Sequence, residues 1–111
     1  MLPKQERLGR AEFSKYFAIG KRVSGPYFTW VVTPAPIFKA AVVVSKKVAK
    51  KAHERNRLKR RLYHGFSRTQ FGSKDRQGVY LLFVKPAAAT LSKVALAQEF
   101  IAALTRVTNM R

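Results

Sequence analysis

The stretch from Ser45 to Phe66 holds the densest set of charged side chains in the sequence. It contains one acid, Glu54, and the cations Lys46, Lys47, Lys50, Lys51, Arg55, Arg57, Lys59, Arg60 and Arg61. Like charges four residues apart on a helix each cost roughly a few tenths of a kcal/mol. Solvated helix faces usually mix both signs of charge, and this one does not. The pattern therefore favours contact with a nucleic acid over a plain solvated face.

At helical period the same stretch has an apolar stripe, formed by Leu58, Leu62 and Phe66. Arg57 and Arg60 fall near the opposite side of this predicted helix, whereas Arg55 and Lys59 project close to the stripe. Cations so close to a packing face indicate a helix that is only half covered, with an open groove along one flank.

The whole chain is strongly basic. Its 111 residues include 23 Lys and Arg against 5 Asp and Glu, which gives a formal net charge of +18. Such a charge points to a nucleic acid or an anionic membrane surface as the partner. A hydrophobic content of 47% is too high for a disordered basic tail. We therefore expect one folded basic domain over residues 1–111, and its partner is a nucleic acid or an anionic membrane surface.

The sequence offers no sign of export or membrane insertion. The N-terminal MLPKQERLGR lacks the apolar segment of a secretory signal, and no apolar run approaches the ~20 residues of a membrane span. The absence of cysteine excludes a disulfide framework and a thiolate metal site. We expect a cytoplasmic protein with no membrane partner.

Independent catalysis is not expected. The five acids are scattered over most of the chain, as Glu6, Glu12, Glu54, Asp75 and Glu99. The two histidines, His53 and His64, lie eleven residues apart, too far to share one metal ion. No glycine-rich phosphate loop, serine elbow or HExxH motif is present. We predict no catalytic residue, no metal site and no small-molecule substrate.

The first half of the chain predicts a helix followed by two strands. A short helix over 11–19 is closed by Gly20, a residue suited to the position after a helix end. Residues 27–33 and 39–45 are rich in aromatic or β-branched side chains, which is typical of strands. Two prolines separate these runs, and we expect a hairpin-like connection that makes the strands antiparallel neighbours.

The second half predicts the basic helix, a strand and a closing helix. The basic helix is expected to end between Phe66 and Gln70, and residues 79–84 form the most apolar strand. Because a long helix separates the strands at 39–45 and 79–84, we expect these two to be parallel. Apolar residues at helical spacing predict the buried face of the closing helix, namely Val94, Ala97, Ile101 and Leu104. The order αββαβα indicates a single α+β sandwich.

Several aromatic residues have two readings. Phe13 and Phe17 lie one turn apart on the first helix, and the residue pattern alone favours placing them in the core. Together with the strand residues Tyr27, Phe28 and Trp30, they could also flank the basic helix across a groove. Aromatic faces beside a basic wall suit single-stranded nucleic acid, because unpaired bases stack on such faces.

The segment VVVSKKVAKKAHERNRLKRRL resembles the signature of the bacterial ribonuclease P protein subunit. In that signature a valine-rich strand ends in Ser-Lys-Lys, and a basic link leads to Arg-Asn-Arg-x-Lys-Arg on a helix. The matching residues are Ser45, Lys46, Lys47, Arg55, Asn56, Arg57, Lys59 and Arg60. The upstream helix, the late strand and the closing helix also fall where the family has them, so the resemblance covers essentially the whole chain.

The resemblance implies a fold and a function. The fold is an αβββαβα sandwich with a small mixed sheet and a left-handed β-α-β crossover around the basic helix. The first strand region then splits in two around Val23 and Tyr27. The function is that of a non-catalytic subunit of an endoribonuclease, whose partners are ribonuclease P RNA and precursor tRNA. In this family the RNA, with bound Mg²⁺, removes the 5′ leader of the precursor tRNA.

The resemblance also implies roles for individual residues. RNA contacts are expected from Lys46, Lys47, Lys50, Lys51, Arg55, Asn56, Arg57, Lys59, Arg60 and Arg61. Phe13, Phe17 and Phe28 are expected to line the cleft that receives the leader, with Lys47 at its edge.

The sequence departs from the family pattern at a few positions. The link between Ser-Lys-Lys and Arg-Asn-Arg is one residue longer than usual, Ala49 replaces a common glycine, and Val31 stands where a cleft aromatic is expected.

The alternative reading is a general or ribosomal RNA-binding protein without a cleavage role, which predicts basic residues spread over several faces. A membrane-active protein would need a wide exposed apolar face, which the basic helix lacks.

Overall fold

Three α-helices, one short 3-10 helix and a four-stranded sheet make up residues 7–68 and 78–109, the part of the chain that the computed structural model describes. In chain order they are α1 (Arg10–Ile19), β1 (Lys21–Ser24), β2 (Phe28–Thr33), β3 (Phe38–Val43), α2 (Ala52–Arg68), β4 (Gly78–Val84), η2 (Pro86–Thr90) and α3 (Lys93–Asn109). A turn at Gly25-Pro26 separates β1 from β2, which confirms the split of the first strand region.

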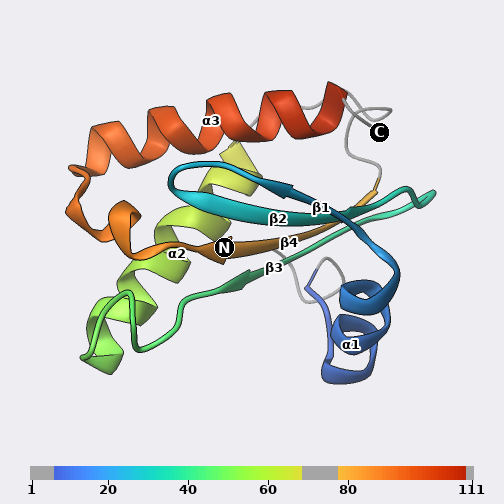
Figure 1. Ribbon diagram of the computed structural model, residues 1–111, viewed down its shortest axis with the longest axis horizontal. Helices are drawn as coiled ribbons and strands as arrows, with labels where there is room; N and C mark the ends of the chain where they lie inside the picture. Colours follow the sequence, from blue (N-terminus) through green and yellow to red (C-terminus); the bar gives the residue numbers. More distant parts are fainter. Residues whose placement is uncertain (1–6, 69–77, 110–111) are drawn as a thin grey trace.

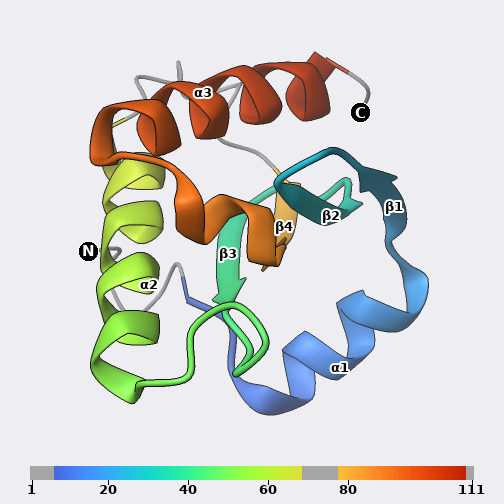
Figure 2. The same ribbon diagram turned by 60° about the vertical axis from the view of Figure 1, so that its left-hand side comes forward.

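The sheet has the order β1-β2-β4-β3. β2 is antiparallel to β1 and β4, whereas β3 is parallel to β4, which confirms the expected crossover. The path from β3 through α2 to β4 is left-handed (Figures 1 and 2). The expectation that β2 and β3 are hydrogen-bonded neighbours is wrong, because β4 lies between them. β4 is buried over nearly its whole length, as suits a central strand with both faces covered.

One face of the sheet carries the main core beneath α2 and α3 (Figures 1 and 2). At its centre the Trp30 ring lies 6.0 Å from that of Phe66 and 5.9 Å from that of Phe100, measured between centroids. The Phe66 and Phe100 rings meet edge to face at 4.9 Å. The helices come close at Gly65, where a Cβ would lie 3.0 Å from the Phe100 ring. The predicted apolar stripe is confirmed by the burial of Leu58, Leu62 and Phe66.

The helix α1 covers part of the opposite face. This smaller core consists of Val31, Ala41, Val79 and Leu81. None of the residues of α1 is itself buried, so its aromatic side chains remain partly exposed. At the end of α1, Gly20 has φ of −73°, which is not a left-handed value. Glycine suits this position for another reason, since a Cβ would overlap with Val31 Cγ1.

The buried face of α3 differs from the expected one. It consists of Leu96, Phe100, Ala103, Leu104 and Val107, whereas Val94 is 67% exposed and Ile101 is 51% exposed. Of the residues expected on the buried face, only Leu104 lies there, since Ala97 is also exposed. α3 carries apolar residues around most of its circumference, and Phe100 selects the buried side because its ring fills the space beside Phe66.

No helix within residues 7–68 and 78–109 has the length and apolarity needed to cross a membrane.

Candidate RNA interface

The Ser-Lys-Lys-Val segment forms a turn directly after β3. The carbonyl oxygen of Ser45 accepts hydrogen bonds from the backbone N–H of Val48 at 3.1 Å and of Ala49 at 3.4 Å. Val48 is 9% exposed and packs into the main core. Lys46 and Lys47 lie between Ser45 and Val48 and are exposed. The buried Val48 therefore anchors a turn whose two lysines face the solvent.

Arg55 fixes the link between this turn and α2. Its Nη1 donates hydrogen bonds to the carbonyl oxygens of Ala49 at 3.0 Å and Lys50 at 2.7 Å. At the start of the helix, the carbonyl oxygen of Lys51 accepts from the backbone N–H of Glu54 and of Arg55. Arg55 was expected to contact RNA. The structure gives it an internal role, in which it shapes the link that is one residue longer than usual.

The outward side of α2 extends the positive surface of the turn. We call a set of exposed residues of the turn, the link and the outward side of α2 the basic surface. They are Lys46, Lys47, Lys50, Lys51, Asn56, Arg57 and Arg60. Lys59 and Arg61 are half-buried at its edges. Because Leu62 anchors the inner side of the helix with 2% exposure, the outer side keeps a fixed direction. Adjacent phosphates of a folded RNA can be contacted by such a rigid array of cations.

Phe13, Phe17 and Phe83 form a second feature, which we call the aromatic strip, where α1 meets β4. The Phe13 and Phe17 rings stack with centroids 6.2 Å apart, and their planes differ by 15°. The centroid of the Phe83 ring lies 6.0 Å from that of Phe13 and 5.6 Å from that of Phe17, and both pairs are arranged edge to face. Phe17 is 37% exposed, and the Arg22 guanidinium carbon lies 4.8 Å from its ring centroid. The core reading is therefore wrong for Phe17, which is exposed, and holds only in part for Phe13, which is half-buried against the smaller core.

A row of side chains crosses the four strands beside the aromatic strip. The register places Ser24 opposite Thr29, Thr29 opposite Phe83, and Phe83 opposite Val43. Ser24 is exposed and the other three are half-exposed. In Figure 1, α1 lies below one end of the strands and the turn after β3 lies near the other end. Partly open sheet surface therefore continues from the aromatic strip toward the turn that carries the two lysines.

Sequence reasoning missed Phe83 and Arg22. Phe83 belongs to a strand that was expected to be apolar on both faces, so nothing distinguished it from its neighbours. The available signal was the alternation along β4, which puts Phe83 on the same face as Leu81. Arg22 lies three residues after the end of α1, and its position opposite Val31 places it on the face that α1 covers.

Phe28 does not belong to the aromatic strip. It is 3% exposed and packs against Trp30 in the main core, with ring centroids 6.4 Å apart. Phe13 and Phe17 lie on the other side of the sheet, so the expectation that all three rings line one cleft is wrong. The expected groove of aromatic residues alongside the basic helix is wrong for the same reason, since Trp30 is also buried.

Two lysines tie the elements around the strip together. Lys39 Nζ on β3 donates a hydrogen bond to Glu12 Oε2 on α1 at 2.6 Å, an ion pair that links the helix to the sheet. This bond, together with one from the Gly9 backbone N–H, lowers the pKa of the Glu12 carboxyl. Lys85 Nζ donates to Ser24 Oγ at 2.8 Å and to the carbonyl oxygen of Gly25 at 2.6 Å. Both sides of the strip are thereby fixed in place.

The residues that the structure describes contain no group of three or more His, Cys, Asp or Glu side chains that could hold a metal ion. The acids Glu6 and Asp75 lie outside the described residues.

Comparisons with known proteins agree on one family. The family model for ribonuclease P matches residues 2–108. A ribonuclease P protein component from a Pseudanabaena species is 44% identical over 66 residues, which is 56% of this chain and only 57% of that protein's length. The corresponding protein of a Synechococcus species is 31% identical over 96% of this chain and 94% of its own. The RNase P protein from Thermotoga maritima has a TM-score of 0.77 at 22% identity, over 91% of this chain and 96% of that one, which shows a shared fold.

Proposed function

The chain belongs to the ribonuclease P protein family, and from this premise we propose that it is the protein subunit of a ribonuclease P holoenzyme. In this proposal the basic surface binds the catalytic ribonuclease P RNA, and the aromatic strip receives the 5′ leader of precursor tRNA. The observation that carries it is the presence of two different kinds of surface on one small protein, one for phosphates and one for bases.

The basic surface suits a folded RNA. Its cations lie on one turn and one helix side, and that helix is anchored by Leu62 and Phe66, which are 2% and 0% exposed. Bonds from charged donors to phosphate oxygens give affinity without reading the base sequence. Arg57 and Arg60 lie one turn apart on the exposed side, a spacing that allows contact with neighbouring phosphates.

The aromatic strip suits a single strand. The rings of Phe17, Phe13 and Phe83 are only partly covered, and every unpaired base offers a flat face that stacks on such rings for about 1–3 kcal/mol. The Arg22 guanidinium beside Phe17 adds a cation for the backbone of the same strand. A leader sequence varies between precursor tRNAs, so a surface that accepts any base is appropriate.

The chemistry would belong to the RNA partner, and Mg²⁺ held by that RNA would supply the activation of water for hydrolysis of the phosphodiester bond. The chain itself binds and orients: the basic surface holds the RNA, and the aromatic strip holds the leader on the 5′ side of the cleavage point. It acts in the cytoplasm, where precursor tRNA is made, and it needs no small-molecule substrate.

A general or ribosomal RNA-binding protein is the competing reading. A general RNA-binding protein would not require a half-exposed aromatic strip on the sheet face that α2 and α3 leave uncovered. It also predicts the same affinity for precursor tRNA with and without a leader.

Cleavage of labelled precursor tRNA by a bacterial ribonuclease P RNA at low Mg²⁺ tests the proposal. We expect the chain to raise the cleavage rate and the variant R57A/R60A to lose most of this stimulation. The matched control K21A/K93A removes two exposed cations that lie outside the basic surface, and it should keep the stimulation. Absence of stimulation by the unaltered chain, together with equally tight binding to unrelated structured RNAs, would favour the competing reading.

A further inference from the structure

Two exposed histidines on α2 have no role in the function proposed above. They are His53 and His64, the two histidines of the chain. Among the described residues, neither imidazole forms a hydrogen bond or an ion pair. Both rings are therefore open to a partner molecule, and their place on the helix indicates what that partner is.

The histidines continue the line of the two exposed arginines of α2. His53 lies four residues before Arg57, which is about one turn of helix. His64 lies four residues after Arg60, about one turn beyond it at the other end. At about 100° per residue, the four side chains fall within about 60° around the helix axis and extend over about 16 Å along it. Leu62, which is 2% exposed, lies on the opposite side. The outward side of α2 thus presents two guanidinium groups with an imidazole at each end.

His53 lies within the basic surface. Lys50 in the link precedes it by three residues, Arg57 follows it by one turn, and both cations are exposed. Glu54, the one acid of α2, is turned about 100° away from His53 around the helix. An RNA backbone that contacts both Lys50 and Arg57 would therefore pass beside the His53 imidazole.

His64 extends the basic surface at its other end. Among the described side chains of α2, its charged neighbours are Arg60, which is exposed, and Arg61, which is half-buried. β3 and α3 pack on α2 away from this side, through Tyr63 and Gly65. The charged residues of β3 and α3 form no hydrogen bond or ion pair with either histidine, and they are Lys39, Lys93, Glu99 and Arg106. The charges around both imidazoles are therefore mainly positive.

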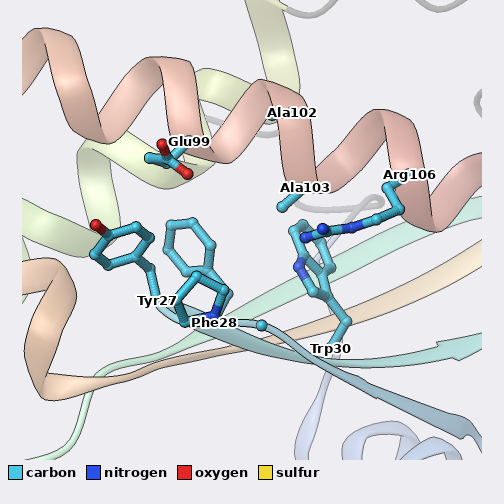
Figure 3. A pocket seen from close by; sticks show the side chains of 9 residues that line it. Tyr27, Phe28, Trp30, Glu99, Ala102, Ala103 and Arg106 are labelled. Atoms are coloured by element: carbon cyan, nitrogen blue, oxygen red, sulfur yellow. The ribbon is translucent and has the colours of Figure 1, made fainter.

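α3 offers a contrast within the same chain. Figure 3 shows two of its charged residues, Glu99 and Arg106, which have opposite signs and line a small cavity beside Tyr27. The line of four side chains on α2 contains no acid. In the free chain, a proton on either imidazole adds a like charge one turn from an arginine, and such pairs are unfavourable. A bound phosphate reverses this balance, because a protonated imidazole donates a charge-assisted hydrogen bond to it.

We propose that His53 and His64 bind phosphates of the catalytic RNA as imidazolium ions, so that the chain takes up protons when it binds RNA. The proposal deepens the function proposed above and rests on it in taking the catalytic RNA as the partner of the basic surface. The RNA-bound chain then holds more protons than the free chain, so a lower pH favours the bound state. Affinity for RNA should therefore rise as the pH falls through the range near pH 6.5 in which an imidazole gains its proton.

Filter binding of the full chain to ribonuclease P RNA at pH 6 and pH 8, each from 50 to 400 mM salt, tests the proposal. The affinity of the unaltered chain should rise about tenfold from pH 8 to pH 6. Its slope of log affinity against log salt should steepen by about 2, because each imidazolium neutralises one more phosphate. H53Q/H64Q should lose most of both changes. H53K/H64K carries permanent cations at the same positions, so its slope at pH 8 should match that of the unaltered chain at pH 6.

Three outcomes would overturn the proposal. Equal pH dependence of the unaltered chain and H53Q/H64Q would mean that other groups of the protein or the RNA gain the protons. Affinity and salt slope that do not change with pH, together with intact stimulation of cleavage, would remove this role of the histidines and leave the proposed function standing. Absence of tight binding to the catalytic RNA at both pH values would overturn the proposed function as well. Thermal melting at both pH values checks that each variant is folded, and the exposure of both side chains means that their replacement leaves no cavity.

Discussion

The basic surface and the aromatic strip are built in opposite ways. Along the basic surface, charged groups are exposed, and apolar residues such as Leu62 are buried beneath them. Along the strip, apolar rings are left half-exposed, and Arg22 is the one cation in contact with them among the described residues. The first arrangement is ordinary for a surface helix apart from its scarcity of acids, since Glu54 is the only acid in α2. The second costs burial, because Phe17 keeps 37% of its surface in water.

The difference teaches what each surface recognises. Binding through lysine and arginine depends on the release of counterions, so it weakens steeply with salt and ignores base identity. Stacking on aromatic faces depends on unpaired bases, and because it neutralises no phosphate it releases no counterions. Two mechanisms with different dependences on salt can therefore be separated by experiment, and substitutions in one surface should leave the other intact.

The largest effect is expected from the basic surface. R57A/R60A removes two contacts of charged donors, each worth about 1.5–3 kcal/mol, so affinity for the catalytic RNA should fall about 100-fold or more. The slope of log affinity against log salt should become shallower by about 2. Filter binding from 50 to 400 mM salt measures both quantities. An unchanged slope would show that these arginines do not contact phosphates.

A smaller and differently selective effect is expected from the aromatic strip. F17A removes one stacking face, so affinity of the holoenzyme for precursor tRNA with a leader should fall about 5- to 150-fold. Affinity for tRNA without a leader and the salt slope should not change. I19A is the matched control, because Ile19 is 61% exposed on the same helix but lies outside the strip. An equal loss with and without the leader would contradict the assignment.

Arg22 allows the contributions of charge and of stacking to be separated at the aromatic strip, because it is a cation in contact with Phe17. R22Q removes a guanidinium that lies 4.8 Å from the Phe17 centroid and that is placed to pair with the leader backbone, and an exposed ion pair is worth up to about 1 kcal/mol. Leader-dependent affinity should fall about 2- to 5-fold. K21Q on the preceding residue, which points to the other side of β1, should have no effect. Equal losses in the two variants would reduce the role of Arg22 to general charge.

The smallest effect concerns how α1 is held against the sheet. Hydrogen bonds from Lys39 and from the Gly9 N–H lower the pKa of Glu12 below 4.5 in the folded chain, so the ionised carboxylate stabilises the fold. This contribution is complete above the unfolded pKa of Glu12 and is lost as the pH falls through the lower folded value. The melting temperature of the unaltered chain should therefore exceed that of E12Q at pH 7, and the two should converge as the pH falls through the lowered folded pKa of Glu12. K39Q should remove much of the same difference. A constant gap between the two chains at all pH values would show that Glu12 acts only through packing.

Local features of the basic surface, and one strand pairing, were predictable from the sequence. Leu58 and Leu62 set the inner side of α2 by their spacing, and the exposure of Arg57 and Arg60 follows from geometry. The pairing of 39–45 with 79–84 in parallel followed from the long helix between them. In each case the information lies within a few turns of chain.

The rest depends on contacts between distant segments. β4 lies between β2 and β3 in the sheet. The two prolines in the loop from β2 to β3 do not indicate that a strand about 40 residues later will separate these two strands. Phe28 and Phe83 are both strand aromatics in neighbouring positions, and only the docking of α1 decides which of them is left partly open. On α3, Val94 and Phe100 were equally good core candidates until the position of Phe66 was known.

The most direct test of the division between the two surfaces is site-specific photo-crosslinking in the assembled holoenzyme. One variant carries a benzophenone side chain in place of Phe17, and the other carries it in place of Arg60. We predict crosslinks from position 17 to the leader of bound precursor tRNA and crosslinks from position 60 to the catalytic RNA. Crosslinks from both positions to the same RNA segment would contradict the account.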